Sequence, residues 1–152
     1  SVVTYLMNKE GFTPDEMSDL LNKKSGFVGL SGVSSDCRDL RHAANEGNKR
    51  AIMTLEIVVY QIKKFIGSYI AAMNGVDAII FTAGVGENSA SQRLAIASGL
   101  EFMGVKMDAE ANNVRGKETV ISSADSKVKV LLIPTNEELM IATDTAAIVK
   151  GN

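Results

Sequence analysis

A run of apolar residues at the helical spacing constrains the fold of this chain most. Apolar residues recur in alternating steps of four and three, at Ala51, Leu55, Val58, Ile62, Phe65, Tyr69 and Ala72. This spacing predicts a helix of about 25 residues over 48–73. A helix with one apolar stripe usually packs that stripe on a sheet or on neighbouring helices, although a seven-residue repeat can also form a coiled-coil seam.

Two later apolar runs predict buried strands, at residues 76–82 and 127–133. A helix is expected after each strand, one beyond the glycine-containing loop at 83–89 and one capped by Thr135 or Asn136. Strands and helices that alternate in this way predict an α/β fold, helix-rich, with a small parallel sheet and right-handed crossovers. Because two strands are few for such a sheet, the rest of the sheet is expected upstream.

Weaker patterns mark the remaining segments. Thr13, Pro14 and Glu16 match a capping box with proline at the first helical position, so a helix is expected to start there. A helix with Leu94, Ile96, Ala97 and Leu100 on its apolar face is expected after the glycine-containing loop. The polar stretch 108–126 is expected to contain one edge strand near 119–122.

Composition limits the classes of function. The 152 residues suffice for one domain or part of a larger one, and the net charge of −2 leaves no basic stripe for a nucleic acid. The single cysteine, Cys37, excludes an internal disulfide and fits a reducing cytoplasm. No apolar run approaches the roughly 20 residues of a membrane span. The chain opens with Ser-Val-Val-Thr, so we expect it to start within a longer protein.

The junction at residues 81–89 carries the first candidate site. Its two glycines allow a ligand to approach the backbone, and the amides that open a helix are donors for phosphate or ribose oxygens. The loop also leaves the carboxyl end of a strand, where ligands of open α/β sheets bind. The third position of the dinucleotide fingerprint is Ser89 rather than glycine. A nucleotide site and a plain tight turn therefore both remain open.

Two further polar motifs have two interpretations each. Residues 34–41 combine a carboxylate for ribose hydroxyls with an arginine for a base or a phosphate, or they form a helix start capped by Ser35 with a surface ion pair. Glu137 and Glu138 follow a strand end and can help to hold a magnesium ion. They can equally be favourable partners for the dipole of a helix that begins there.

Three blocks together resemble the acetate kinase (acetokinase) family. They are Gly-Val-Ser-Ser-Asp-Cys-Arg-Asp-Leu at 32–40, Phe-Thr-Ala-Gly-Val-Gly-Glu-Asn-Ser at 81–89 and Ile-Pro-Thr-Asn-Glu-Glu-Leu at 133–139. Their order and spacing are those of the family, and the long helix with Lys-Lys-Phe-Ile-Gly at 63–67 is similar too. The resemblance covers essentially the whole chain. It implies a ribonuclease-H-like fold of the actin and sugar-kinase superfamily, whose two domains close on ATP.

The resemblance also implies roles for particular residues. One departure is Cys37, where the family commonly has an aromatic or other bulky residue, which puts the side-chain packing there in doubt. Glu137 matches a magnesium-associated carboxylate needed for activity. The positions that match nucleotide contacts are Asp36, Cys37, Arg38, Gly84, Val85, Gly86, Glu87 and Asn88.

The implied reaction is reversible, magnesium-dependent phosphoryl transfer between ATP and acetate, giving ADP and acetyl phosphate, a step toward acetyl-CoA. Residues 1–152 resemble the C-terminal, nucleotide-binding portion of a cytoplasmic homodimeric enzyme, with a helix at about 135–152 that returns toward the N-terminal domain. The acetate pocket, the catalytic arginine and the stabilising histidine match positions upstream, so the chain alone is expected to be inactive. A propionate or butyrate kinase, and a non-catalytic nucleotide-binding or dimerisation module, remain alternatives.

Overall fold

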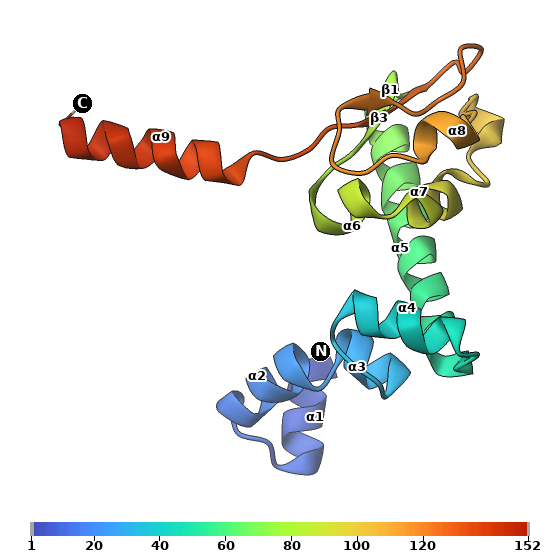
Figure 1. Cartoon of the computed structure of the whole chain (residues 1–152). Helices are drawn as coiled ribbons and strands as arrows, with labels where there is room; N and C mark the ends of the chain where they lie inside the picture. Colours follow the sequence, from blue (N-terminus) through green and yellow to red (C-terminus); the bar gives the residue numbers. More distant parts are fainter. Residues whose placement is uncertain (1, 152) are drawn as a thin grey trace. The chain divides into compact units, whose positions relative to one another are not determined.

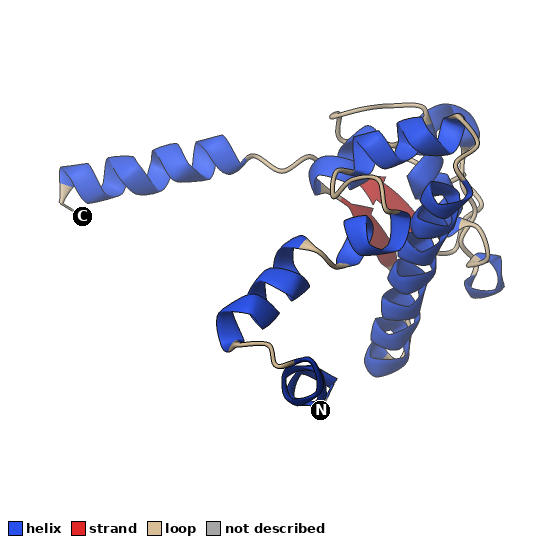
Figure 2. Cartoon of the chain, turned by 90° about the horizontal axis from the view of Figure 1, so that it is seen from below, coloured by secondary structure: helices blue, strands red, loops and turns tan. Residues whose placement is uncertain are grey.

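The computed structural model describes residues 2–151 and divides into two compact units, unit 1 (Ser1–Gln61) and unit 2 (Ile62–Asn152) (Figure 1). Helices make up most of both units. Among the described residues, strands occur in unit 2 (Figure 2). No helix within residues 2–151 is long and apolar enough to cross a membrane.

Unit 1 is helical. Its elements are α1 (Val2–Glu10), α2 (Pro14–Lys23), α3 (Gly26–Ser31), α4 (Cys37–Asn45) and the first part of α5 (Lys49–Met73). The predicted capping box starts α2, because Thr13 Oγ1 accepts from Glu16 N at 3.3 Å and Glu16 Oε2 accepts from Thr13 N at 2.9 Å. The buried apolar side chains of this unit are Met17, Leu40 and Ala51.

Helix α5 confirms the long helix predicted from the apolar stripe, but its second half faces differently. Phe65 and Tyr69 of the stripe are 62% and 63% exposed. Ile62, which belongs to the stripe, is half-buried, and so are Ile66 and Ile70, which follow it at steps of four and lie outside the stripe. An α-helix turns every 3.6 residues, so a stripe with a seven-residue repeat drifts around it by about 20° per heptad. That drift carries the end of the stripe away from the sheet.

The sheet of unit 2 has the order β1-β3-β2, with β1 at Ala78–Phe81, β3 at Lys129–Leu132 and β2 at Thr119–Val120. β1 and β3 pair in parallel, which confirms the predicted parallel core. The edge strand β2 pairs antiparallel with β3, so the small sheet is mixed rather than wholly parallel. Within residues 2–151 the outer edge of β1 pairs with no other strand.

Unit 2 also contains helical elements beyond α5. They are α6 (Ala83–Asn88), α7 (Ala90–Ala97), the 3-10 turn η1 (Glu101–Met103), α8 (Ala109–Asn112) and α9 (Glu137–Lys150). Ile96 and Ala97 of α7 are buried, as predicted for its apolar face, and so are Val130 and Leu132 of β3. Leu94, assigned to the same face, is 42% exposed. The preceding residue, Arg93, is buried in its place.

Helix α9 begins where β3 ends. Ile133 N still donates to Phe81 O at 3.0 Å, and Pro134, which has no N–H, ends the strand pairing. Asn136 caps the helix, because its Oδ1 accepts from Leu139 N at 3.2 Å. Every residue of α9 is exposed. The start of this helix is therefore held by the few contacts that precede it.

Candidate functional site

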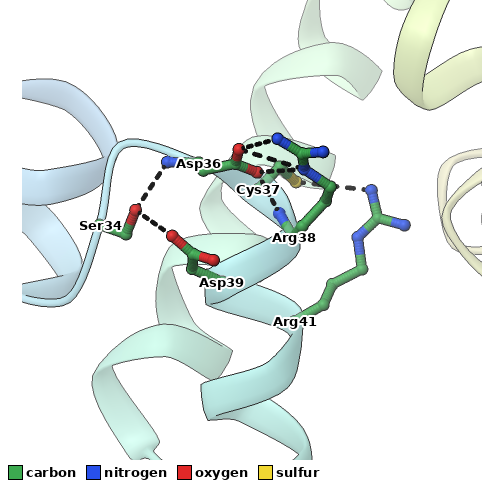
Figure 3. Close-up of polar contacts among 6 residues, drawn as sticks. All are labelled: Ser34, Asp36, Cys37, Arg38, Asp39 and Arg41. Carbon is green, nitrogen blue, oxygen red and sulfur yellow. Dashed lines mark hydrogen bonds and ion pairs between the residues drawn. The ribbon is translucent and has the colours of Figure 1, made fainter.

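The first group of predicted site residues lies at the start of α4 in unit 1 (Figure 3). Asp36 is the N-cap, and its Oδ1 accepts from Arg38 N at 2.7 Å. Its Oδ2 also accepts from Arg38 Nη2 at 2.6 Å. Ser34 supports the turn, since its Oγ accepts from Asp36 N at 3.0 Å and donates to Asp39 Oδ2 at 2.7 Å. The cap is thus Asp36, and the expectation that Ser35 caps this helix is wrong.

The ion pair between Asp36 and Arg38 sets the charge at this helix start. The side-chain hydrogen bonds from Arg38, followed by the bond from its backbone N–H, lower the pKa of Asp36 to about 2. The side chain of Arg38 is 87% exposed, so the pair lies in solvent, where such pairs contribute little to stability. The carboxylate stays ionised at neutral pH, and the guanidinium remains accessible to an anionic ligand.

Cys37 occupies the first position of α4 and is half-buried. Its Sγ accepts a long hydrogen bond from Arg41 Nη2 at 3.7 Å (Figure 3). The resemblance implies a bulkier residue at this position, and here the side chain of Arg41 contacts the smaller cysteine. With the cysteine in place, Asp36 still caps α4 and still pairs with Arg38.

The second group surrounds α6, which follows β1 directly. Ala83, the first residue of α6, has a φ of +58°, a left-handed conformation that costs a residue with a Cβ about 1–2 kcal/mol. Gly84 and Gly86 do not have positive φ values, so neither glycine is needed for the turn itself. A Cβ on Gly84 would meet no atom within 4 Å, whereas one on Gly86 would lie 3.5 Å from the backbone of Phe81. Nothing inside the described structure requires glycine at position 84.

Glu87 and Asn88 point their side chains back onto the chain. Glu87 Oε1 accepts from Ala83 N at 2.8 Å, from Thr135 N at 2.7 Å and from Thr135 Oγ1 at 3.0 Å. The backbone N–H of Thr135, foremost among these donors, lowers the pKa of Glu87. Asn88 Nδ2 donates to Gly84 O at 2.8 Å. One amide at the start of α6, that of Ala83, is therefore already used within the protein.

Glu137 is the first residue of α9 and its side chain is exposed. It shares an open hollow of about 280 Å³ with five other residues. The lining residues are Ala83, Gly84, Glu87, Thr135, Glu137 and Glu138. The structure thus brings Gly84, Glu87 and Glu137 together around one hollow, although they are up to 53 residues apart in sequence.

A second, apolar hollow of about 290 Å³ lies on the β1 side of the same loop. Val85 and Gly86 line it together with residues of α5, β1 and α7, among them Ile62, Phe81 and Ile96. The loop at 84–88 therefore has one polar and one apolar neighbouring space. That combination suits a ligand with an apolar ring and a charged end.

The carboxylates of the polar hollow fit a magnesium ion in number and kind. Mg²⁺ is usually held by one or two carboxylates, with water and substrate phosphate oxygens completing its shell. Glu137 and Glu138 are exposed beside the hollow, and Glu87 is occupied by its own hydrogen bonds. Within residues 2–151 no group of three or more His, Cys, Asp or Glu side chains is placed to hold a metal ion by itself. Such an ion would depend on ligand oxygens.

Arg93 of α7 was missed by the sequence analysis and supports the loop from behind. Its side chain is 1% exposed and donates to Gly86 O at 2.8 Å and Glu87 O at 3.1 Å. It also donates to Asn112 Oδ1 at 2.9 Å, Asn112 O at 2.6 Å and Val114 O at 2.7 Å. Burial lowers the pKa of Arg93. The only signal in the sequence was an arginine beside the apolar residues of a predicted helix.

Comparisons with known proteins show the family of this chain. The sequence matches the Acetokinase family over residues 1–143. A protein of Caldanaerobacter subterraneus subsp. tengcongensis named acetate kinase is 60% identical over 152 residues, which are 99% of this chain and 38% of that protein. The chain thus spans well under half the length of this relative.

Two solved structures are similar over almost the whole chain. The crystal structure of Porphyromonas gingivalis acetate kinase has a TM-score of 0.87 and 49% identity, and the match covers 97% of this chain and 37% of that one. A propionate kinase from Francisella tularensis subsp. tularensis SCHU S4 has a TM-score of 0.81 and 37% identity, with 93% of this chain and 36% of that one covered.

Proposed function

The chain belongs to the acetokinase family, and on that premise we propose that it forms the nucleotide-binding portion of an acetate kinase. The proposed reaction is reversible phosphoryl transfer between ATP and acetate. The observation that carries the proposal is the hollow where Gly84 and Glu87 meet Glu137. It combines open backbone with carboxylates at the carboxyl ends of two parallel strands, where ligands of α/β sheets bind.

Nucleotide binding is assigned to the two groups of residues. In unit 2 the bare backbone at Gly84 allows close approach, and the apolar hollow beside Val85 and Gly86 can take the adenine ring. In unit 1 the ionised Asp36 carboxylate can accept from ribose hydroxyls, while the exposed Arg38 guanidinium can stack on a base or bind phosphate.

Glu137 is the residue proposed to associate with Mg²⁺. A bound Mg²⁺ bridges and neutralises phosphate oxygens of the nucleotide. Glu137 is exposed and lies beside the hollow. Among the hydrogen bonds described for residues 2–151 none involves its carboxylate, so this group is available to hold such an ion. Phosphoryl transfer needs positioning and charge neutralisation more than covalent help, which suits a site built of backbone and carboxylates.

Acetate binding is assigned to parts of the enzyme outside these 152 residues. The curated relatives are longer, with this chain matching 38% of the Caldanaerobacter protein. We therefore expect the 152-residue chain alone to bind nucleotide without forming acetyl phosphate. Helix α9 is proposed to return toward a preceding domain, because it carries five exposed apolar side chains, Leu139, Met140, Ile141, Ile148 and Val149.

We further propose that the protein is a homodimer and that it is cytoplasmic. Exposed Phe65, Tyr69 and Met73 on α5, each more than 60% exposed, supply apolar surface that a second copy can cover. The single Cys37 suits a reducing compartment, where disulfides are rare. Sedimentation of the purified protein would separate monomer from dimer.

Two alternatives are kept, each for a stated reason. A propionate kinase is structurally similar at 37% identity, so the acceptor can be propionate, or butyrate, instead of acetate. A non-catalytic nucleotide-binding or dimerisation module would use the same surface without the reaction.

The testing experiment is a phosphoryl-transfer assay on the full polypeptide encoded at the locus of this chain. Purified protein is incubated with ATP, Mg²⁺ and acetate, propionate or butyrate, and the acyl phosphate is trapped as its hydroxamate. We expect turnover to be fastest with acetate, to require Mg²⁺, and to be lost in Glu137→Ala. Faster turnover with propionate or butyrate would change the acceptor, and nucleotide binding without any transfer would favour the non-catalytic module.

A further inference from the structure

The side chain of Glu87 faces into the protein rather than into the hollow that it borders. Its Oε1 accepts three hydrogen bonds, two from Thr135 at 2.7 and 3.0 Å and one from Ala83 N at 2.8 Å. A carboxylate oxygen has two lone pairs, so three donors saturate this atom. Oε1 is therefore not free to bind a ligand, and it joins two segments that lie 48 residues apart.

The Thr135 side of this contact is otherwise weakly held. The pairing of β3 with β1 ends at Ile133, and Pro134 has no N–H to continue it. Beyond Thr135, every residue of α9 is exposed. Glu137 lies two residues after Thr135, so its position relative to the loop at 84–88 depends on what fixes Thr135. The hydrogen bonds described for Thr135 are those to Glu87.

The Glu87 side is firmly held. The backbone carbonyl of Glu87 accepts from Arg93 Nη1 at 3.1 Å and from Gly116 N at 3.4 Å. The same Oε1 that holds Thr135 also accepts from Ala83, whose left-handed φ of +58° must be kept in place by its surroundings. One atom thus connects a fixed loop, a strained residue and an otherwise free helix start.

We propose that Glu87 is a positioning residue, whose carboxylate holds Thr135 so that Glu137 stays opposite Gly84 across the hollow. We call its three hydrogen bonds the Glu87 clamp. The inference rests on the proposed function in one respect, the role of Glu137 toward a metal-bound nucleotide. It refines the role that the family resemblance implies for Glu87, from a contact with the nucleotide to a contact within the protein.

The clamp itself is tested on the ¹⁵N-labelled 152-residue chain without nucleotide. Amide hydrogen exchange is measured for Thr135 and Ala83 in wild type, Glu87→Ala, Thr135→Val and the double variant. In Glu87→Ala, exchange at Thr135 should accelerate by about tenfold or more, because an exposed amide loses its acceptor. Thr135→Val removes only the hydroxyl donor and should accelerate it less. The double variant should add nothing to Glu87→Ala.

The control is Glu118→Ala, since Glu118 is an exposed glutamate of the same unit. Exchange at Thr135 should be unchanged in this variant. The clamp would be overturned if Thr135 exchanged at the wild-type rate in Glu87→Ala. It would also be overturned if exchange at Thr135 accelerated equally in Glu118→Ala. Should Glu87→Ala fail to fold, Thr135→Val still decides, because unchanged exchange at its own amide contradicts the proposal.

Nucleotide binding then separates positioning from direct contact. Calorimetric titration with ADP is done with Mg²⁺ and with EDTA. A positioning role predicts that Glu87→Ala weakens Mg²⁺-ADP binding by about tenfold and metal-free ADP binding little, because Glu137 acts through the metal. Equal weakening in both buffers would mean a direct contact. If wild type binds ADP in neither buffer, the proposed nucleotide function of the chain fails, while the exchange data still decide on the clamp.

Discussion

Replacing Arg93 with methionine tests the support of the loop at 84–88 from behind. Each of the five N–H groups of the Arg93 guanidinium donates to an oxygen of the protein, and the side chain is 1% exposed. No carboxylate is paired with it in the described ion pairs. Methionine keeps much of the apolar stem and removes all five donors.

The expected loss of stability follows from these contacts. A hydrogen bond from a charged donor contributes about 1.5–3 kcal/mol net, and a buried carbonyl left without a donor costs about 1–3 kcal/mol. These values do not add over five bonds to one group, because wild type also bears the cost of removing the guanidinium from water. We therefore expect Arg93→Met to lower the free energy of unfolding by about 3–5 kcal/mol, which corresponds to about two of these hydrogen bonds rather than to all five.

The assay is urea unfolding of the chain followed by circular dichroism at 222 nm. With a slope of about 2 kcal/mol per molar urea, the midpoint should fall by about 1.5–2.5 M. Arg93→Lys keeps the charge but cannot reach both the α6 carbonyls and those of Asn112 and Val114, so it should lose more than half as much. The matched control is Arg115→Met, at an exposed arginine of the same unit, expected within about 0.5 kcal/mol of wild type. A wild-type midpoint for Arg93→Met or Arg93→Lys would refute this reasoning.

Three further predictions follow from the site. Gly84→Ala should leave the chain as stable or about 0.5–1 kcal/mol more stable, because its Cβ meets no atom and alanine favours a helix; calorimetry should nevertheless show weaker ADP binding, and unchanged binding would remove Gly84 from the nucleotide site. Ala83→Gly should raise the free energy of unfolding by about 0.5–1 kcal/mol, since glycine adopts the φ of +58° without a Cβ penalty; a lower urea midpoint would contradict the strain. The Asp36 carboxyl should titrate near pH 2 when followed by NMR, because Arg38 lowers its pKa to about 2 from 3.8. A carboxyl whose pKa is lower in the folded than in the unfolded state stabilises the folded state at a pH above the unfolded pKa. The contribution of Asp36 to stability should therefore be complete above about pH 4 and disappear as the pH falls toward 2. In Arg38→Met the midpoint should move up toward 3.8, and a midpoint near 2 would assign the shift to another cause.

Local patterns predicted the elements of the fold well. The apolar spacing gave α5, the two apolar runs gave β1 and β3, and Pro134 marked the end of β3. Each of these features depends on neighbours within a few residues, so the sequence states them directly. The exposed faces of Phe65 and Tyr69 were not predicted, because the direction of a helix face depends on what packs against it.

The sequence patterns named candidate residues but not the contacts that these residues make. Asp36 and Arg38 form an ion pair at the start of α4, as one interpretation of the motif indicated, but Asp36 rather than Ser35 accepts the capping bond. The hydrogen bonds of Arg93 to Asn112 span 19 residues, and those of Glu87 to Thr135 span 48. Pairings over such separations depend on how elements distant in sequence pack together, and they leave no periodic signal in the sequence.

The most direct test of nucleotide binding by this chain is an NMR titration with Mg²⁺-ADP. Backbone amide shifts of the ¹⁵N-labelled 152-residue chain are followed while the nucleotide is added, with Gly84→Ala as the weakened control. We expect saturable shifts at residues 84–88, at Glu137 and at Asp36 to Arg38, all reduced in the control. Saturation without shifts at residues 84–88, or no shift anywhere at millimolar nucleotide, would contradict it.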